Sequence, residues 1–229
     1  MSNLSVVLLF FQAICFTIVS SQDYPYQVYV TAGGFTCGGT LIANDIVVSA
    51  ILCADFNNNF NVNNNDAFNV NNNDAFNVVV RSGSSETETT ATTYQVSDDL
   101  ALFKLDPPIS FNEFVQPIPI ADRNPIAGDS CVVPGWVETD DAISIDVQLT
   151  NVVILAKPVC QSLSLIPLLN LQRLCVLNVG ACVNDLGAPL VCNGKLSGVS
   201  VGTSGCVAGV PQVYADVDAI RALLAAANL

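Results

Sequence analysis

A turn of small and polar residues between two cysteines lies in the last quarter of the chain and reads Cys182-Val183-Asn184-Asp185-Leu186-Gly187-Ala188-Pro189-Leu190-Val191-Cys192. Glycine and proline near the middle are typical of a turn, and the apolar residues that follow predict a strand running into Cys192. Leu186 lies at the centre of the turn. Its side chain has no lone pair and no ionisable proton, so it can neither attack a carbonyl carbon nor be activated by a neighbouring base.

The composition is that of a disulfide-bonded globular protein. The chain has 229 residues, 9 cysteines, 51% apolar residues and a formal net charge of −13, which is typical of a secreted protein of one or two domains. Lys and Arg together number only 7 and form no basic cluster, so binding to nucleic acid or to an anionic membrane lacks an electrostatic basis. We therefore expect an extracellular protein or peptide as the partner, with no nucleic acid and no membrane.

The first 21 residues predict a secretory signal peptide. An uncharged apolar run extends from Val6 to Val19, and small residues at Ser20 and Ser21 predict cleavage before Gln22. A membrane anchor is the alternative, but the apolar run is shorter than the roughly 20 residues needed to span a bilayer. Cleavage would also remove Cys15, leaving eight of the 9 cysteines in an extracellular chain where disulfides persist.

Three segments together resemble the motifs of chymotrypsin-like serine proteases. The turn around Leu186 resembles the nucleophile loop Gly-Asp-Ser-Gly-Gly-Pro, with leucine at the serine position. The stretch Ser49–Cys53 resembles Thr-Ala-Ala-His-Cys, and Leu52 stands at the histidine position. The apolar strand that begins at Asp99 resembles Asp-Ile-Ala-Leu-Leu-Lys-Leu, which places Asp99 at the position of the triad aspartate.

This resemblance covers about residues 24 to 228 and implies an all-β fold, with two antiparallel β-barrels of the chymotrypsin-like type and a C-terminal helix near 219–228. A single homology domain would then occupy residues 22–229, with the first barrel in 22–117 and the second barrel and helix in 118–229. The Thr-rich segment from Glu86 to Gln95 is short for the family, so we expect an abbreviated first barrel.

The family also implies a disulfide pattern. Eight cysteines allow 105 pairings, so spacing alone does not select one. The resemblance implies the pairs Cys37–Cys53, Cys131–Cys192, Cys160–Cys175 and Cys182–Cys206.

The same comparison implies that the catalytic residues are lost. The position of the nucleophile holds Leu186, that of the base holds Leu52, and only Asp99 keeps the family's residue type. The chain contains no histidine at all, although a serine protease triad needs imidazole as its proton shuttle. We expect Asp99 to lie in apolar surroundings and the protein not to be an enzyme.

Other site positions point to binding without cleavage. Asn184 replaces a glycine that supplies an oxyanion-hole donor, and Gly180 lies near the specificity-pocket position that is acidic in trypsin-like members. Ser200, Val201 and Gly202 resemble the strand that pairs with the substrate backbone, so we expect an edge for an extended peptide. No Ile-Val-Gly-Gly activation motif occurs, and we expect no metal and no cofactor.

An eight-residue repeat occupies residues 56–78, where Phe60–Ala67 is repeated identically as Phe68–Ala75. Two copies are too few for a solenoid, so we interpret this Asn-rich repeat as a duplicated surface loop. Calcium binding by the Asn and Asp oxygens is one alternative, and self-association of the tract is another.

These observations leave two hypotheses for the function. The first is a secreted, non-catalytic serine protease homologue that works as a protein-binding or regulatory module, as a decoy or cofactor in an extracellular proteolytic cascade. The second is a serine-type endopeptidase of the trypsin-like family with unconventional or residual activity, in which Asp99 would work with a serine or lysine from elsewhere in the chain.

Overall fold

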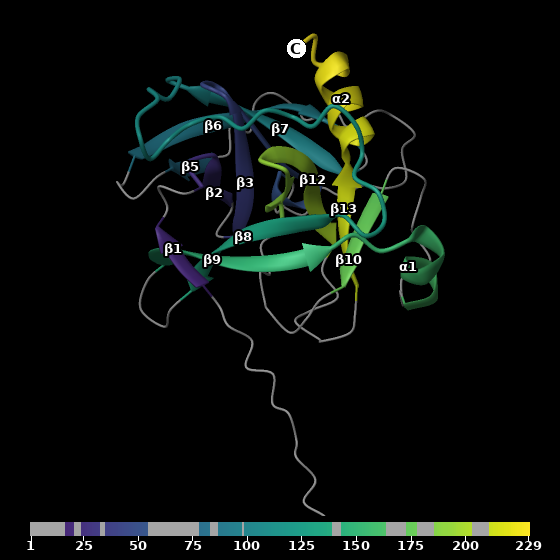
Figure 1. Ribbon diagram of the computed structural model, residues 1–229. Helices are drawn as coiled ribbons and strands as arrows, with labels where there is room; N and C mark the ends of the chain where they lie inside the picture. The colour runs from purple at the N-terminus through teal and green to yellow at the C-terminus, as the bar shows by residue number, and fades with distance from the viewer. Residues whose placement is uncertain are drawn as a thin grey trace, which may run out of the picture.

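The computed structural model describes residues 17–20, 24–32, 35–54, 78–82, 87–97, 99–138, 143–163, 173–177, 186–202 and 211–229. Two antiparallel β-structures make up most of the molecule, and a C-terminal helix lies against them (Figure 1). The fold class predicted from the sequence is therefore confirmed. Residues 55–77, which contain nearly all of the Asn-rich repeat, lie outside the described residues.

The first β-structure is a closed barrel of strands in the order β2-β3-β4-β7-β6-β5. The expectation of an abbreviated first barrel is wrong, because the Thr-rich segment forms a strand that pairs with both β5 and β7 and closes the barrel. Threonine is β-branched and suits a strand at this place. The strands are β2 Gln27–Ala32, β3 Phe35–Ala43, β4 Ile46–Ala50, β5 Val78–Ser82, β6 Thr87–Val96 and β7 Leu100–Asp106.

The second β-structure is a 7-stranded sheet in the order β1-β9-β8-β11-β12-β13-β10. Its strand β12 follows β11 through a tight hairpin in which Asn193 and Gly194 both have positive φ angles, of 53° and 72°. The strands are β1 Thr17–Ser20, β8 Ser130–Glu138, β9 Ile143–Val153, β10 Arg173–Leu177, β11 Pro189–Cys192, β12 Lys195–Gly202 and β13 Pro211–Asp216.

Strand β1 consists of residues that the sequence assigns to the signal peptide. Thr17–Ser20 pairs antiparallel with β9, with Thr17 opposite Leu149 and Ser20 opposite Asp146, at one end of the sheet (Figure 1). The signal peptide stays a prediction, but its predicted cleavage before Gln22 would remove this strand from the fold.

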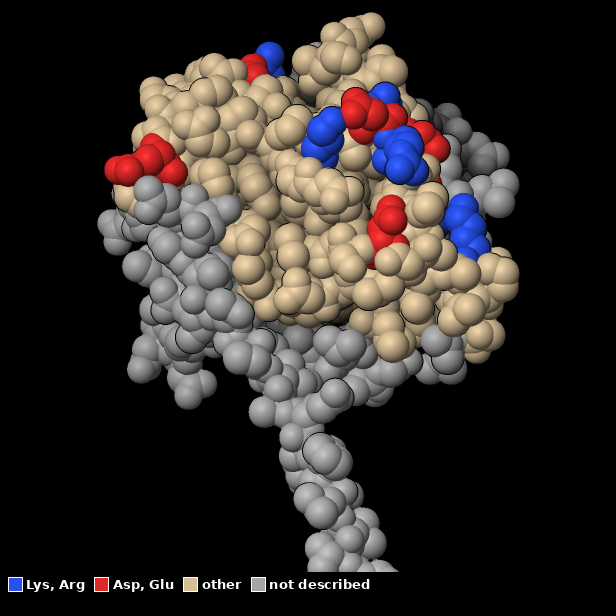
Figure 2. Space-filling view, viewed as in Figure 1, with Lys and Arg blue, Asp and Glu red and all other residues tan. Residues whose placement is uncertain are grey.

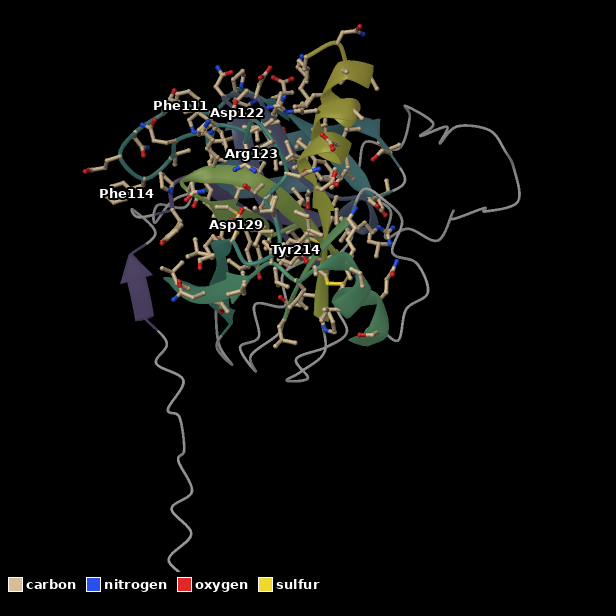
Figure 3. The ribbon with its side chains drawn as sticks, turned by 45° about the vertical axis from the view of Figure 1, so that its right-hand side comes forward. Phe111, Phe114, Asp122, Arg123, Asp129 and Tyr214 are labelled. Atoms are coloured by element: carbon tan, nitrogen blue, oxygen red, sulfur yellow. A yellow bond between two sulfur atoms is a disulfide. The ribbon has the colours of Figure 1, made fainter. Side chains whose placement is uncertain are left out.

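The linker between the two β-structures, residues 107–129, forms backbone hydrogen bonds with both of them. The N–H of Gln116 donates to the oxygen of Pro25 at 3.0 Å, and that of Ala121 donates to the oxygen of Leu196 at 2.9 Å. Figure 3 shows Phe111 and Phe114 on the loop that begins this linker. The linker thus holds the first barrel against the second sheet.

Three helical segments complete the described fold: the 3-10 turn η2 Ile51–Cys53, α1 Lys157–Leu163 and α2 Val217–Ala226. The predicted C-terminal helix is confirmed as α2. Asp216 caps its first turn by accepting a hydrogen bond from the Ala219 N–H at 3.0 Å. Its inner face buries Val217, Ile220 and Leu223.

The apolar residues form a core in each β-structure and a third cluster between them. The large buried side chains include Phe103 in the first barrel and Tyr214 in the second sheet; Tyr214 is labelled in Figure 3. Three of the four disulfides implied by the family resemblance are present: Cys37–Cys53, Cys131–Cys192 and Cys160–Cys175. Cys182 and Cys206 lie outside the described residues.

Candidate functional site

The three positions that the sequence singled out come from both halves of the molecule. Leu52 lies in η2 directly after β4, and Asp99 directly precedes β7. Strands β4 and β7 pair with Ala50 opposite Leu100, and the Ile51 N–H donates to the backbone oxygen of Asp99 at 2.8 Å. The pairing of these strands therefore brings the turn of Leu52 next to Asp99.

Leu186 is carried to the same region from the second sheet. The Gly38 N–H donates to the backbone oxygen of Leu186 at 2.8 Å, and the Gly187 N–H donates to the oxygen of Ser200 at 2.8 Å. The Cys53 sulfur lies 3.8 Å from the Leu186 oxygen. The turn is thus bonded to the first barrel on one side and to β12 on the other, and the side chain of Leu186 packs against the core of the first barrel.

Glycine is required after Leu186 for two reasons. Gly187 has a φ angle of +86°, and a Cβ atom at this position would lie 2.1 Å from both the Gly38 oxygen and the Ser49 Oγ. Ser49 Oγ itself donates to the Gly38 oxygen at 2.6 Å. A side chain at this position would be strained by the positive φ angle and would collide with these two oxygens, so glycine is needed directly after Leu186.

Asp99 is held by an arginine from the other half of the molecule. Arg173, the first residue of β10, donates from Nε to Asp99 Oδ2 at 2.9 Å and from Nη2 to Asp99 Oδ1. The two side chains are only 18% and 14% exposed. The expected apolar surroundings of Asp99 are therefore wrong, because a guanidinium group binds the carboxylate through two parallel hydrogen bonds.

The two leucines differ in their surroundings. Leu52 is 44% exposed, whereas Leu186 is partly buried against the first barrel. A leucine this exposed contributes little to the core. It leaves an apolar side chain at the surface, one residue along the chain from Ile51, whose N–H bonds to Asp99.

The predicted peptide-binding edge is narrower than the sequence suggests. Ser200 is 3% exposed, and both of its backbone groups bond to the turn at 187–188: its N–H donates to the Ala188 oxygen at 2.9 Å, and its oxygen accepts from Gly187. Strand β12 also lies between β11 and β13. Val201 and Gly202 lie beyond the end of β11, where no described strand pairs with them on that side; they are the part of the predicted edge that an extended peptide would use.

Asn184 and Gly180 lie outside the described residues, as does Asp185. The oxyanion-hole and specificity-pocket interpretations therefore stay predictions.

The sequence analysis missed Arg173. Two features of the sequence could have drawn attention to this residue. Arg173 is one of only 7 cations. It also lies two residues before Cys175, which forms a disulfide with Cys160. A cation at the start of a short apolar strand needs an acidic partner once it is buried. Nothing in the local pattern indicates that this partner is Asp99.

A second group of charges lies on the linker and next to α2 (Figure 2). Asp122 pairs with Lys195 at 2.5 Å, and this hydrogen bond is the main cause that lowers the pKa of Asp122. Arg221 donates to the Ala121 oxygen at 2.7 Å, and Figure 3 shows Arg123 beside Asp122. Acids and bases are mixed in this group, so it forms no positive patch.

The described residues offer neither a metal-binding cluster nor a membrane-spanning helix. Among the described residues, no group of three or more His, Cys, Asp or Glu side chains is arranged to hold a metal ion. None of the described helices has the length and apolar character needed to cross a bilayer.

Comparisons with known proteins agree with this fold. The family profile named Trypsin matches residues 16–224. Trypsin-2 of Salmo salar is 30% identical over 212 residues, which cover 86% of this chain and 87% of that protein. Kallikrein-4 of Homo sapiens is 29% identical over 216 residues, covering 89% of this chain and 84% of that protein. The solved structure of kallikrein-related peptidase 10 superposes with a TM-score of 0.70 at 22% identity, covering 92% of this chain and 98% of that one.

Proposed function

This chain belongs to the trypsin family of serine proteases, and we propose that it acts within that family as a secreted, non-catalytic member. In this role it binds an extended segment of another extracellular protein and regulates it, as a decoy or cofactor in a proteolytic cascade.

The observation that carries this proposal is the set of residues brought together at the site. Leu52, Asp99 and Leu186 stand at the positions of the family's base, acid and nucleophile. The leucines transfer no proton and form no covalent bond to a carbonyl carbon. The carboxylate of Asp99 is already bound by Arg173, so it is not free to orient a base.

Binding is supported by the apolar surface that remains. Leu52 is 44% exposed, and covering the rest of a leucine side chain contributes about 1 kcal/mol. The backbone of Val201 and Gly202 offers a short edge for β-augmentation beside the same turn. An extended segment with an apolar side chain fits these two features.

An extracellular role is supported by the cysteines and by the charge. The structure forms three disulfides, which persist in oxidising compartments. The net charge of −13 disfavours nucleic acid and anionic membranes as ligands. A protein partner remains.

The proposal is tested on the full chain, produced in a secreting cell, with one assay of activity and one of binding. The first is labelling by a fluorophosphonate together with turnover of a mixed peptide library, for which we expect no labelling and no cleavage. The second is selection of binding peptides from a displayed library, followed by measurement of their dissociation constants. Stoichiometric labelling mapped to any residue would support the alternative of an unconventional serine endopeptidase and overturn this proposal.

A matched pair of variants locates the binding surface. We expect Leu52→Ser to weaken binding of a selected peptide about fivefold, since about 1 kcal/mol of apolar burial is lost. Val153→Ser changes a comparably exposed residue, 48% exposed, on β9 of the second sheet, and we expect it to leave the affinity unchanged. Equal losses in both variants, or none in Leu52→Ser, would exclude the surface around Leu52 as the binding site.

A further inference from the structure

The N-terminal strand of the second sheet bears on where the secreted chain begins. Thr17–Ser20 forms β1 and pairs along its whole length with Asp146–Leu149 of β9 (Figure 1). Since β1 lies at one end of the sheet, β9 has β8 as its other neighbour. The backbone of β9 at Asp146–Leu149 is therefore covered on both sides only while residues 17–20 are part of the protein.

Cleavage before Gln22 would remove that cover. It would delete β1 and turn β9, a strand of 11 residues, into an open edge. Exposed strand edges pair with other chains, and proteins usually cover them. Only residues 22 and 23 would then precede Tyr24, too short a stretch to replace the lost strand.

The family match points the same way from a separate observation. The Trypsin profile matches from residue 16 onward, so its first matched residues include the whole of β1. The folded domain therefore begins upstream of Thr17, inside the segment that hydropathy alone assigns to the signal peptide.

The sequence contains a second site that meets the signal-peptidase rule. Ala13-Ile14-Cys15 has small residues at the third and last positions before a cut. The segment before it, Val6–Cys15, is apolar except for Gln12. Ser21 with Val19 meets the same rule before Gln22, so the rule alone does not choose between the two sites. The pairing of β1 with β9 favours the earlier site, because only a cut before Phe16 keeps β1 in the secreted protein.

We propose that signal peptidase cuts between Cys15 and Phe16, so that the secreted protein begins at Phe16 and keeps β1. The enzyme hydrolyses the Cys15–Phe16 peptide bond with one water molecule, leaving a carboxylate on Cys15 and an ammonium group on Phe16. This cut removes Cys15 as the cut before Gln22 does, so eight cysteines remain in either case.

The decisive measurement is the N-terminal sequence and intact mass of the protein secreted from cells that express residues 1–229. We expect Phe16 at the N terminus and no free thiol. A secreted chain that begins at Gln22, or at any other residue, would overturn the proposal. Neither result depends on whether the protein binds peptides or cleaves them.

Two blocking variants test the cut itself. A large charged residue in the last position before a cut violates the small-residue rule, so we expect Cys15→Glu to abolish the Phe16 N terminus. The matched control Ser21→Glu places the same charge before Gln22, and we expect it to leave Phe16 as the N terminus. Loss of normal processing in Ser21→Glu but not in Cys15→Glu would contradict the proposal.

A third experiment asks whether the retained strand is part of the fold. Ile18→Pro removes a backbone donor from β1, and we expect it to lower the Tm of the secreted protein by roughly 2–5 °C. The control Ile18→Val keeps strand propensity, and its Tm should match that of the wild type. If the true cut lies before Gln22, all three secreted proteins are identical in mass and Tm, and the proposal fails. If Ile18→Pro is not secreted, slow hydrogen exchange at the amides of Thr17–Ser20 in the wild type gives the same answer.

Discussion

Two aspartates at opposite ends of strands show how differently a buried carboxylate is accommodated in this molecule. Asp99, before β7, receives two hydrogen bonds from the guanidinium group of Arg173. Asp216, at the end of β13, is 2% exposed and accepts hydrogen bonds from the Ala219 N–H at 3.0 Å and the Asn124 Nδ2 at 3.2 Å. The charge of Lys157 also acts on this carboxylate, in the direction that lowers its pKa.

The difference in partners has electrostatic consequences. Burial raises the pKa of Asp216, and the hydrogen bond from the Ala219 N–H only partly opposes this effect, while the nearby charge of Asp218 adds to it. Asp99 instead has a full positive charge in direct contact. Asp99 is thus paired with a cation in direct contact, whereas Asp216 accepts hydrogen bonds from neutral groups, and the charge of Lys157 affects its pKa less than burial does.

Breaking the Asp99–Arg173 pair should have the largest effect on stability. Arg173→Ala leaves the largely buried carboxylate of Asp99 without its cation, and we expect the free energy of unfolding to fall by about 2–3 kcal/mol. The matched control is Lys195→Ala in the pair with Asp122, whose side chains are 41% and 82% exposed. Because solvent screens an exposed ion pair, this variant should lose far less stability than Arg173→Ala. Denaturant unfolding measures both.

The double variant Asp99→Ala with Arg173→Ala completes this test. It removes both charges, so we expect it to be more stable than Arg173→Ala alone. Strictly additive losses would mean that the two side chains do not interact in solution.

The second prediction concerns the partner of Asp99: whether a histidine placed at position 52 can bind this carboxylate while Arg173 is still present. Leu52→His combined with Leu186→Ser should give no efficient protease, because Arg173 still binds Asp99 and the chain has no Ile-Val-Gly-Gly activation motif. We expect a stability loss of about 1–2 kcal/mol, most of it from Leu186, which packs against the first barrel. Circular dichroism checks the fold and a mixed peptide library checks turnover. Cleavage at rates typical of trypsins would show that Arg173 does not keep Asp99 from a histidine.

A smaller effect is expected at the other aspartate. Asp216→Ala removes the N-cap of α2 and should lower the free energy of unfolding by about 1 kcal/mol. Asp216→Asn keeps a side-chain oxygen that accepts from the Ala219 N–H, so it should cost less than half as much. Helix α2 should also exchange its first-turn amides faster in the alanine variant; equal exchange in the two variants would argue against the cap.

The smallest effect is a dependence on pH. Because the pKa of Asp216 is raised in the folded state, folded protein binds this proton more tightly than unfolded chain. The resulting stability is full below the unfolded pKa and is lost as pH rises through the folded pKa. Relative to Asp216→Asn, the wild type should therefore gain stability on acidification, as measured by denaturant unfolding across the acidic range.

Asp122 supplies a control of the opposite sign. Lys195 lowers its pKa, so its contribution is present above the unfolded pKa and is lost as pH falls. The wild type should lose stability relative to Asp122→Asn on acidification. The same sign for both aspartates would contradict the contrast between cationic and neutral partners.

Much of the fold follows from patterns within short segments. The alternation of β2 and the short apolar runs of β4 and β7 predict strands from the local sequence alone. The turn at Gly187 needs glycine because of its own φ angle and its close neighbours. The Thr-rich segment was misjudged, because the sequence alone does not reveal that β5 and β7 lie on either side of it and close the barrel.

The amino-acid sequence alone fixes which side chains are available to the protein. Folding creates no histidine, because the chain contains none, so the prediction that the family's triad is incomplete rests on the residues alone. The tertiary structure decided which groups meet. The bonding of Arg173 to Asp99 joins residues 74 positions apart, and the cover of β9 by β1 joins segments still more distant. Such contacts depend on the path of the whole chain, because hydrogen bonds and ion pairs act only over a few ångströms while local patterns extend over a few residues.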